Sequence, residues 1–208
     1  VLLDNSGKEY SAVIAAAEKR CMKLHVIGEN EGDREATADV ALLFGYLKNA
    51  DKNEFIVQKA VELGVKKIVA FSSEYSSAYM NENKLERLNK VSREAAKQCL
   101  RSVAPRVIYC GDFQSALKEA DGYENKLFAC EFAKDSEAEL STLKGGCALI
   151  VGSEGGFSEK EAALAKENGF SSITLGKRIL RAETAAVALM AVVMFSLGEL
   201  GGRRGGKE

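Results

Sequence analysis

The fold is decided by residues 148–161, which read ALIVGSEGGFSEKE. The first four residues form an apolar run typical of a strand that is buried on both faces of a sheet. Ser158 and Glu161 have the spacing of a capping box, which opens a helix. Three glycines within five residues lie between strand and helix, where they let a ligand approach the backbone closely. The stretch predicts a strand, a ligand-binding loop and a helix, although a simple tight turn would have the same composition.

Around this unit, strand-like apolar runs alternate with helical patterns from about residue 48 to residue 200. This alternation is typical of an α/β fold with a mostly parallel sheet. Strands are expected at residues 67–71, 107–110, 127–130, 148–151 and 173–175. Helices are expected at residues 51–63, 85–99, 113–120, 158–169 and 183–200.

The first 45 residues have a different pattern, in which short strands are separated by turns. Strands are expected at residues 2–3, 10–14, 23–27 and 40–44, with a polar loop at residues 28–39. These strands are too few to close a barrel, so we expect part of a β-domain whose first half precedes Val1. At the other end, residues 201–208 are glycine-rich and charged, and we expect a mobile tail.

Composition excludes several classes of protein. The chain has 208 residues, 46% hydrophobic and 28% charged, the usual balance of a globular protein. Five cysteines without a CxxC pair and a single histidine predict no metal site, and they favour free thiols in the cytoplasm. The longest apolar run, residues 185–195, is shorter than the ~18 residues of a membrane span, so no membrane association is expected. A formal net charge of -1 neither favours nor excludes a nucleic acid, so an RNA partner must be inferred from a local site.

A second loop leaves the last expected strand and leads into the last helix. Residues 175–185 read LGKRILRAETA, and Arg178 and Arg181 suit a phosphate or another polyanion. The carboxyl ends of parallel strands share one edge of a sheet, where α/β proteins bind ligands, so both loops should meet there. A solvated charged turn is the alternative for this stretch alone.

Polar side chains also stand on two of the expected helices. They are Gln58, Lys59, Glu62 and Arg101. From physical chemistry alone, such residues are more often solvated helix faces than functional groups.

Taken together, these stretches resemble the bacterial 16S rRNA (uracil-N3)-methyltransferases, the RsmE family. The resemblance rests on residues 58–64, 95–101, 152–158 and 175–185. It implies a SPOUT-type α/β domain with a deep trefoil knot at residues 46–200, preceded by a partial PUA-like RNA-binding β-barrel at residues 1–45. It also implies a homodimer built through the knotted domain, with the 16S rRNA of the small ribosomal subunit as partner.

The resemblance further implies S-adenosylmethionine (SAM) as cofactor, bound in a bent shape by the loops of the knot. The residues implied for the cofactor are Glu131, Gly152, Gly155, Leu175, Gly176, Ile179, Leu180, Thr184 and Ala185. Those implied for RNA are Lys59, Arg101 and Arg178. The chain departs from the family at Ser153, where proline is usual, and at Ala182, where threonine is common. An arginine often found near Tyr75 is absent, and Ser153 is expected to loosen the cofactor loop.

Methylation of N3 of uracil requires removal of a weakly acidic proton or stabilisation of the resulting anion. Arg181 is the candidate for stabilising charge on the uracil oxygens. Glu154 or Glu183 is the candidate base. Three other functions stay open: a knotted methyltransferase acting on the ribose 2′-oxygen, a non-catalytic RNA-binding module, and a nucleotide- or phosphate-binding α/β protein.

Overall fold

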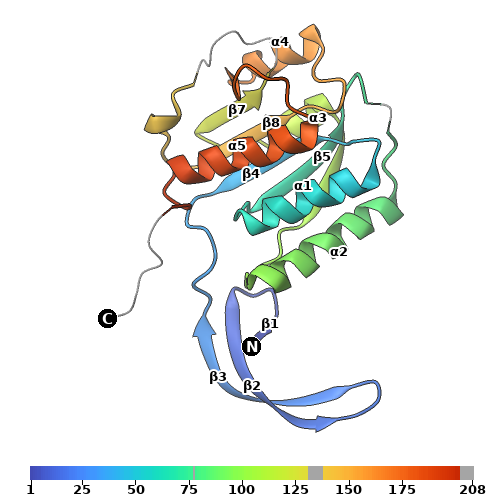
Figure 1. Cartoon of the computed structure of the whole chain (residues 1–208), viewed down its shortest axis with the longest axis vertical. Coiled ribbons are helices and arrows are strands. Elements are labelled where there is room, and N and C mark those ends of the chain that lie inside the picture. The colour runs from blue at the N-terminus through green and yellow to red at the C-terminus, as the bar shows by residue number, and fades with distance from the viewer. Residues whose placement is uncertain (77, 131–137, 202–208) are drawn as a thin grey trace.

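A six-stranded sheet forms the body of the molecule, and helices cover both of its faces (Figure 1). The computed structural model describes residues 1–76, 78–130 and 138–201. The order of strands is β6-β5-β4-β8-β7-β9, and every pair is parallel. The strands are β4 (Val40–Gly45), β5 (Lys67–Ser72), β6 (Val107–Asp112), β7 (Asn125–Ala129), β8 (Cys147–Val151) and β9 (Ser171–Ile173). The predicted α/β class with a parallel sheet is confirmed.

The helices bury two separate apolar cores, one on each face of the sheet. Helices α1 (Ala50–Glu62), α2 (Glu82–Cys99) and α5 (Ala182–Ser196) pack on one face. Helices α3 (Phe113–Lys118) and α4 (Glu159–Glu167) pack on the other. A short 3-10 helix, η1 (Leu140–Thr142), precedes β8. The strands alternate between the two cores, which is why their sequences are apolar at nearly every position.

The predicted assignment of residues 40–44 to the N-terminal β-unit is wrong. The strand they form, β4, lies between β5 and β8 in the large sheet, and all six of its residues are buried. An uninterrupted apolar run suits a strand covered on both faces, whereas a strand of a small half-exposed sheet would alternate.

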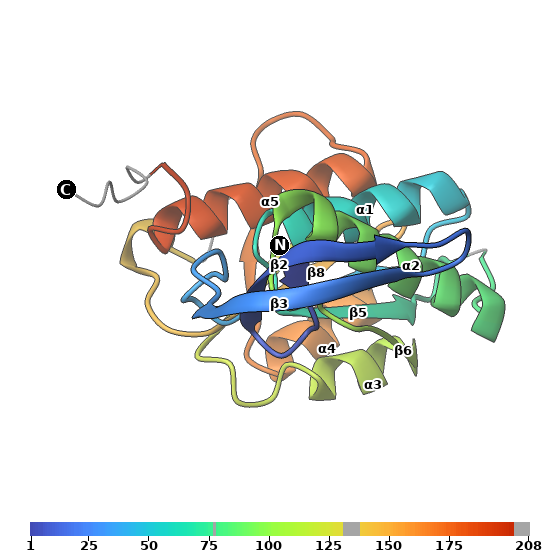
Figure 2. The ribbon, with the colours of Figure 1, turned by 90° about the horizontal axis from the view of Figure 1, so that it is seen from below.

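The N-terminal residues form a separate antiparallel sheet, with strands β1 (Leu2–Leu3), β2 (Lys8–Ala17) and β3 (Met22–Glu31). The long ribbon β2–β3 extends from one end of the α/β body (Figures 1 and 2). Strand β3 continues to Glu31, so the loop predicted at residues 28–39 begins later, at residue 32. The β-rich character of this region is as predicted, and its identification as part of a PUA-like barrel stays a prediction.

The last part of the chain returns from the edge of the sheet to its centre. Strand β9 lies at one edge, whereas α5 packs against α1 and β8. Helix α5 ends at Ser196, before the predicted residue 200, because Gly198 takes a left-handed φ of 79° that closes the helix. Glu131, expected in one loop of the knot, and residues 202–208 of the expected tail lie outside the described residues, so the knot and the mobile tail stay predictions.

Among the described residues, no helix is long and apolar enough to cross a membrane. No group of three or more His, Cys, Asp or Glu residues there is arranged to hold a metal ion.

Candidate active site

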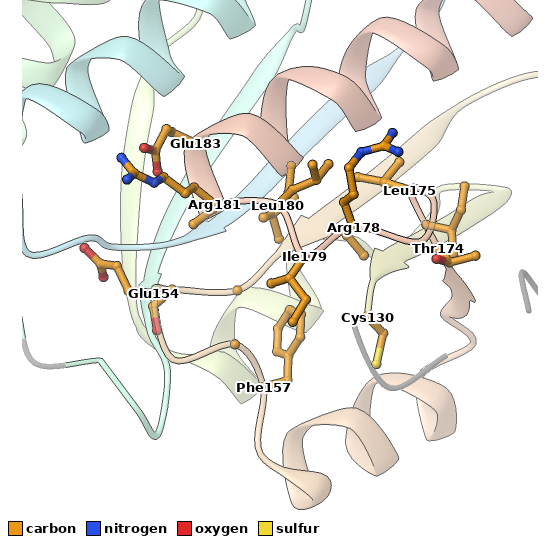
Figure 3. A pocket seen from close by; sticks show the side chains of 18 of the residues that line it. Cys130, Glu154, Phe157, Thr174, Leu175, Arg178, Ile179, Leu180, Arg181 and Glu183 are labelled. Carbon is orange, nitrogen blue, oxygen red and sulfur yellow. The ribbon is translucent and has the colours of Figure 1, made fainter. Parts of the chain in front are cut away.

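A pocket of about 560 Å³ lies beyond the carboxyl ends of β7, β8 and β9 (Figure 3). Its walls come from the two loops that the sequence singled out, residues 152–157 after β8 and residues 174–181 after β9. Cys130, directly after β7, Lys52, in the first turn of α1, and the first turn of α5 also line it. The prediction that the two loops meet at one edge of the sheet is confirmed.

The glycine loop packs closely against β4 and against itself because glycines stand at the points of contact. A Cβ atom built on Gly45, at the end of β4, would lie 2.5 Å from the backbone nitrogen of Ser153. A Cβ atom on Gly152 would lie 3.0 Å from the carbonyl carbon of Gly156. Backbone therefore packs directly on backbone here, so this part of the pocket wall has little room to shift.

Ser153 is held firmly, contrary to the expectation that it loosens the loop. The residue is buried, and its hydroxyl shares a hydrogen bond of 2.8 Å with the hydroxyl of Ser73, in the loop after β5. A buried hydroxyl with a partner fixes the loop to a neighbouring strand end, which a proline could not do.

The predicted capping box at the start of α4 is confirmed. The hydroxyl of Ser158 accepts from the backbone N–H of Glu161, and the Glu161 carboxylate accepts from the backbone N–H of Ser158. The other carboxylate oxygen of Glu161 accepts from the backbone N–H of Glu74 at 2.9 Å. One buried side chain thus joins the glycine loop to the loop between β5 and α2.

The second loop separates its two arginines. Arg181 precedes α5 directly and lies with Glu183 and Glu154 at one end of the pocket (Figure 3). Arg178 lies toward Leu175 and Thr174, at the other end (Figure 3). The loop reverses direction at Gly176, whose φ is 104°, and Ile179 is almost fully exposed at its tip. The two arginines therefore serve different parts of the pocket.

Glu183 forms an ion pair with a lysine that the sequence analysis missed. The Lys52 ammonium lies 3.0 Å from a carboxylate oxygen of Glu183. Burial raises the pKa of Glu183, but hydrogen bonds from its own backbone N–H and Lys52, with the charges of Lys52 and Arg181, outweigh it and lower the pKa. Lys52 was missed because β4 had been placed in another domain. With β4 in the parallel sheet, the start of the helix that follows it, where Lys52 stands, would have been expected at the same edge.

Glu154 is exposed at the rim of the pocket. One of its carboxylate oxygens accepts a hydrogen bond of 2.9 Å from the backbone N–H of Lys48, which follows β4. The other oxygen has no hydrogen-bond partner among the described residues. One oxygen of Glu154 is therefore oriented by the protein, and the other is left open to a ligand at the rim.

Most of the predicted site residues line this one pocket. They are Arg178, Arg181, Glu154, Glu183, Gly152, Gly155, Leu175, Gly176, Ile179, Leu180 and Ala185. Thr184 is exposed in the first turn of α5 but does not line the pocket, and Glu131 lies outside the described residues. Lys59 also lies away from it, paired with Glu62 at 2.8 Å on the same helix.

Arg101 is not available to RNA, and this prediction is corrected. Its side chain is only 4% exposed. The guanidinium donates to the carbonyls of Val61 and Val65, each at 2.9 Å, and to the Glu35 carboxylate at 2.7 Å. A cation with all these internal acceptors has a structural role. Arg101 follows the end of α2 at Cys99 and does not lie on the helix face where the sequence pattern placed it.

The chain matches the family model described as an RNA methyltransferase domain over residues 34–194. The ribosomal RNA small subunit methyltransferase E of Mesomycoplasma hyopneumoniae is 36% identical over 171 residues, which are 81% of this chain and 74% of that protein. The protein of the same name from Bacillus subtilis is 30% identical over 207 residues, 94% of this chain and 80% of that protein.

Solved structures share the fold. A ribosomal RNA small subunit methyltransferase E from Neisseria gonorrhoeae, bound to S-adenosyl methionine, superposes with a TM-score of 0.84 at 30% identity, covering 94% of this chain and 81% of that chain. A putative methyltransferase from Legionella pneumophila, in complex with SAM, gives a TM-score of 0.84 at 27% identity, over 93% and 81% of the two chains. The SPOUT-type fold class is confirmed by these likenesses. The chain belongs to the RNA methyltransferase family that includes the ribosomal RNA small subunit methyltransferases E.

Proposed function

We propose that the protein transfers the methyl group of SAM to N3 of a uridine in the 16S rRNA of the small ribosomal subunit. Family membership supports this activity, as do the SAM-bound relative from Neisseria gonorrhoeae and the names of the curated relatives. The observation that carries the proposal is the meeting of the glycine loop and the Arg181 loop in one pocket at the carboxyl edge of the sheet.

The pocket fits SAM in size and chemistry. Its volume of about 560 Å³ is typical of small-molecule sites, which span roughly 300–1,000 Å³. We assign the adenine and ribose to main-chain groups of Gly152, Leu175, Gly176 and Leu180, all of which line the pocket. When bound, SAM supplies an electrophilic methyl group on a sulfonium.

The charged end of the pocket suits the acceptor base. Arg181 can donate to a uracil oxygen and stabilise the negative charge that develops when N3 loses its proton. Glu154 is the better candidate for the general base that removes the N3 proton, since one of its oxygens has no hydrogen-bond partner among the described residues. Glu183 has a lowered pKa and is a weaker base, so we assign it to holding Lys52 and Arg181 in place.

RNA contacts are proposed at the far end of the pocket and on the helices beside it. Arg178 is exposed at the far end of the pocket and has no ion-pair partner among the described residues. Thr184 stands in the first turn of α5, beside the site, and Lys59 stands in the last turn of α1, farther along the same side of the sheet. Action on ribosomal RNA would place the protein in the cytoplasm.

We also propose that the protein is a homodimer. Helix α5 is apolar on nearly all sides, although only one side packs on the sheet. Its outer side exposes Val192 and Phe195, at 40% and 66%. An exposed apolar helix face of this kind is typical of a surface that a partner covers.

The test of the reaction is methyl transfer from labelled SAM to small-subunit RNA or particles, followed by nucleoside analysis. We expect N3-methyluridine as the labelled product. A ribose-methylated nucleoside would instead assign the protein to the 2′-oxygen class. SAM binding without any transfer would favour a non-catalytic module, and nucleotide binding without SAM binding would favour the nucleotide-binding alternative.

Arg181→Ala should lower kcat about 100-fold or more, the effect of removing one donor that stabilises a developing anion. The Kd for SAM, measured by calorimetry, should stay unchanged because the proposed cofactor contacts are main-chain groups of other residues. Arg181→Lys should restore part of the rate, since an ammonium keeps the charge but loses the planar fork. Equal losses in SAM binding and turnover would show that Arg181 is a cofactor ligand.

A further inference from the structure

Two exposed tyrosines stand in the loop between β5 and α2. Tyr75 is 55% exposed and Tyr79 is 87% exposed. Their phenol groups have no hydrogen-bond partner among the described residues. Two large, largely uncovered rings on one short loop are unusual on a protein surface and indicate a binding surface.

Tyr75 lies directly against the glycine loop of the pocket. A Cβ atom built on Gly155 would lie 2.6 Å from the Cβ atom of Tyr75 and 3.4 Å from its carbonyl oxygen. Gly155 itself lines the pocket. The backbone of Tyr75 thus rests on the pocket rim, while more than half of the residue's surface faces solvent.

The backbone on both sides of Tyr75 is fixed. The N–H of Glu74 donates to Glu161 at 2.9 Å, and the hydroxyl of Ser76 donates to the carbonyl of Tyr46 at 2.9 Å. Ser73 is bonded to Ser153, as described above. The ring is therefore exposed on an anchored segment, so little conformational freedom would be lost when a ligand covers it.

The charges around Tyr75 select the kind of ligand. Glu74 is its neighbour in sequence and is exposed, and Glu154 is exposed in the adjoining loop. Lys84 is a nearby cation, but its ammonium donates to the carbonyl of Tyr79. These carboxylates would repel a phosphate, whereas the flat face of an uncharged nucleobase would not be repelled. Cations suited to phosphates, Lys177 and Arg178, are exposed on the opposite loop of the pocket.

We propose that Tyr75 is a stacking platform for a nucleobase of the RNA next to the target nucleotide, with Tyr79 as a second ring on the same loop. This inference rests on the proposed function. A uridine whose N3 is to be methylated must leave its stack, and its neighbour then lacks one stacking partner. An aromatic ring at the rim of the pocket replaces that partner and holds the strand beside the site.

The first test compares Tyr75→Ala with Tyr75→Phe in binding to a uridine-rich single-stranded oligoribonucleotide. Tyr75→Ala should raise the Kd about 5- to 100-fold, as expected for the loss of one base–aromatic stack, and Tyr75→Phe should keep the affinity. An abasic oligonucleotide of the same length keeps the backbone charge but offers no base, so Tyr75→Ala should leave its affinity unchanged.

The second test uses the absence of tryptophan from the chain. Tyr75→Trp introduces a single tryptophan, whose fluorescence a stacked base should quench when the same oligonucleotide is added. Tyr123→Trp is the control, since Tyr123 precedes β7 and lies at the amino ends of the strands, bonded to Asp39. Quenching at position 75 that does not exceed quenching at position 123 would overturn the proposal.

Two further outcomes would refute the stacking role of Tyr75 without refuting the proposed methyl transfer. If the unaltered protein transfers methyl groups but Tyr75→Ala binds the oligonucleotide as well as the unaltered protein does, the stacking platform is refuted and the enzyme assignment stands. A parallel loss of SAM affinity in Tyr75→Ala would also refute it, because Tyr75 would then act by supporting the glycine loop.

Discussion

Arg101 is the residue whose surroundings most clearly define its role. Its guanidinium joins the end of α1, through the carbonyls of Val61 and Val65, to Glu35 in the segment that links the two sheets. Glu35 also accepts from the backbone N–H of Val103 at 3.0 Å. A single buried side chain therefore connects the linker, α1 and the end of α2.

Arg101→Met should lower the free energy of unfolding by about 3 kcal/mol, because it leaves two buried carbonyls and a carboxylate without their donor. Urea unfolding measures this loss. RNA affinity of the folded variant should equal that of the unaltered protein, whereas an RNA-contacting arginine would lose affinity without losing stability. A loss below about 1 kcal/mol, the range of exposed ion pairs, would contradict the structural role.

The same pair predicts how stability depends on pH. Burial raises the pKa of Glu35, but the hydrogen bond and charge of Arg101, with the N–H of Val103, outweigh it and lower the pKa. A lowered pKa in the folded state stabilises the protein above the unfolded value, about 4.3, and this contribution disappears as the pH falls through the folded pKa. Glu35→Gln should therefore flatten the acid side of the stability curve, measured by thermal unfolding between pH 6 and pH 3, roughly the range in which carboxylates titrate.

Among the elements, the contact between the end of β4 and the glycine loop is the tightest at the site. Gly45→Ala would place a methyl group 2.5 Å from the backbone nitrogen of Ser153, so the loop must shift. We expect SAM affinity to fall at least about tenfold, since a small displacement of positioning groups has large effects. Calorimetry gives the Kd, and circular dichroism checks the fold.

Gly28→Ala is the matched control for Gly45→Ala. Gly28 also lies in a strand, β3, and its added Cβ atom would meet only Ser11, at an ordinary 3.8 Å. SAM affinity should be unchanged in this variant. Normal SAM binding by Gly45→Ala would mean that the loop can move away without cost to the pocket.

The elements also show what the sequence could and could not predict. The start of α4 was predicted correctly because a capping box is local, with Ser158 and Glu161 only three residues apart. The place of β4 was not, because an apolar run does not reveal which strands it pairs with. That error hid Lys52, while the two loops after β8 and β9 were found because their unusual composition lies within each segment.

For the molecule as a whole, the outer face of α5 predicts the oligomeric state. Phe195→Glu places a charge in the centre of the expected dimer contact and should convert the dimer to a monomer. Sedimentation velocity measures the change. Ile27→Glu is the control, since Ile27 is 63% exposed, close to the 66% of Phe195, but lies on the N-terminal ribbon. A monomeric unaltered protein would contradict the prediction.

The carboxylate of Glu161 has a consequence for the sequence of events during catalysis. It ties the segment proposed to meet the RNA to the segment proposed to meet the cofactor, and the hydroxyls of Ser73 and Ser153 add a second tie. The two segments should therefore shift as one rigid piece. Binding of either SAM or RNA would therefore fix the surface that the other ligand binds. Each ligand should then increase the affinity of the protein for the other.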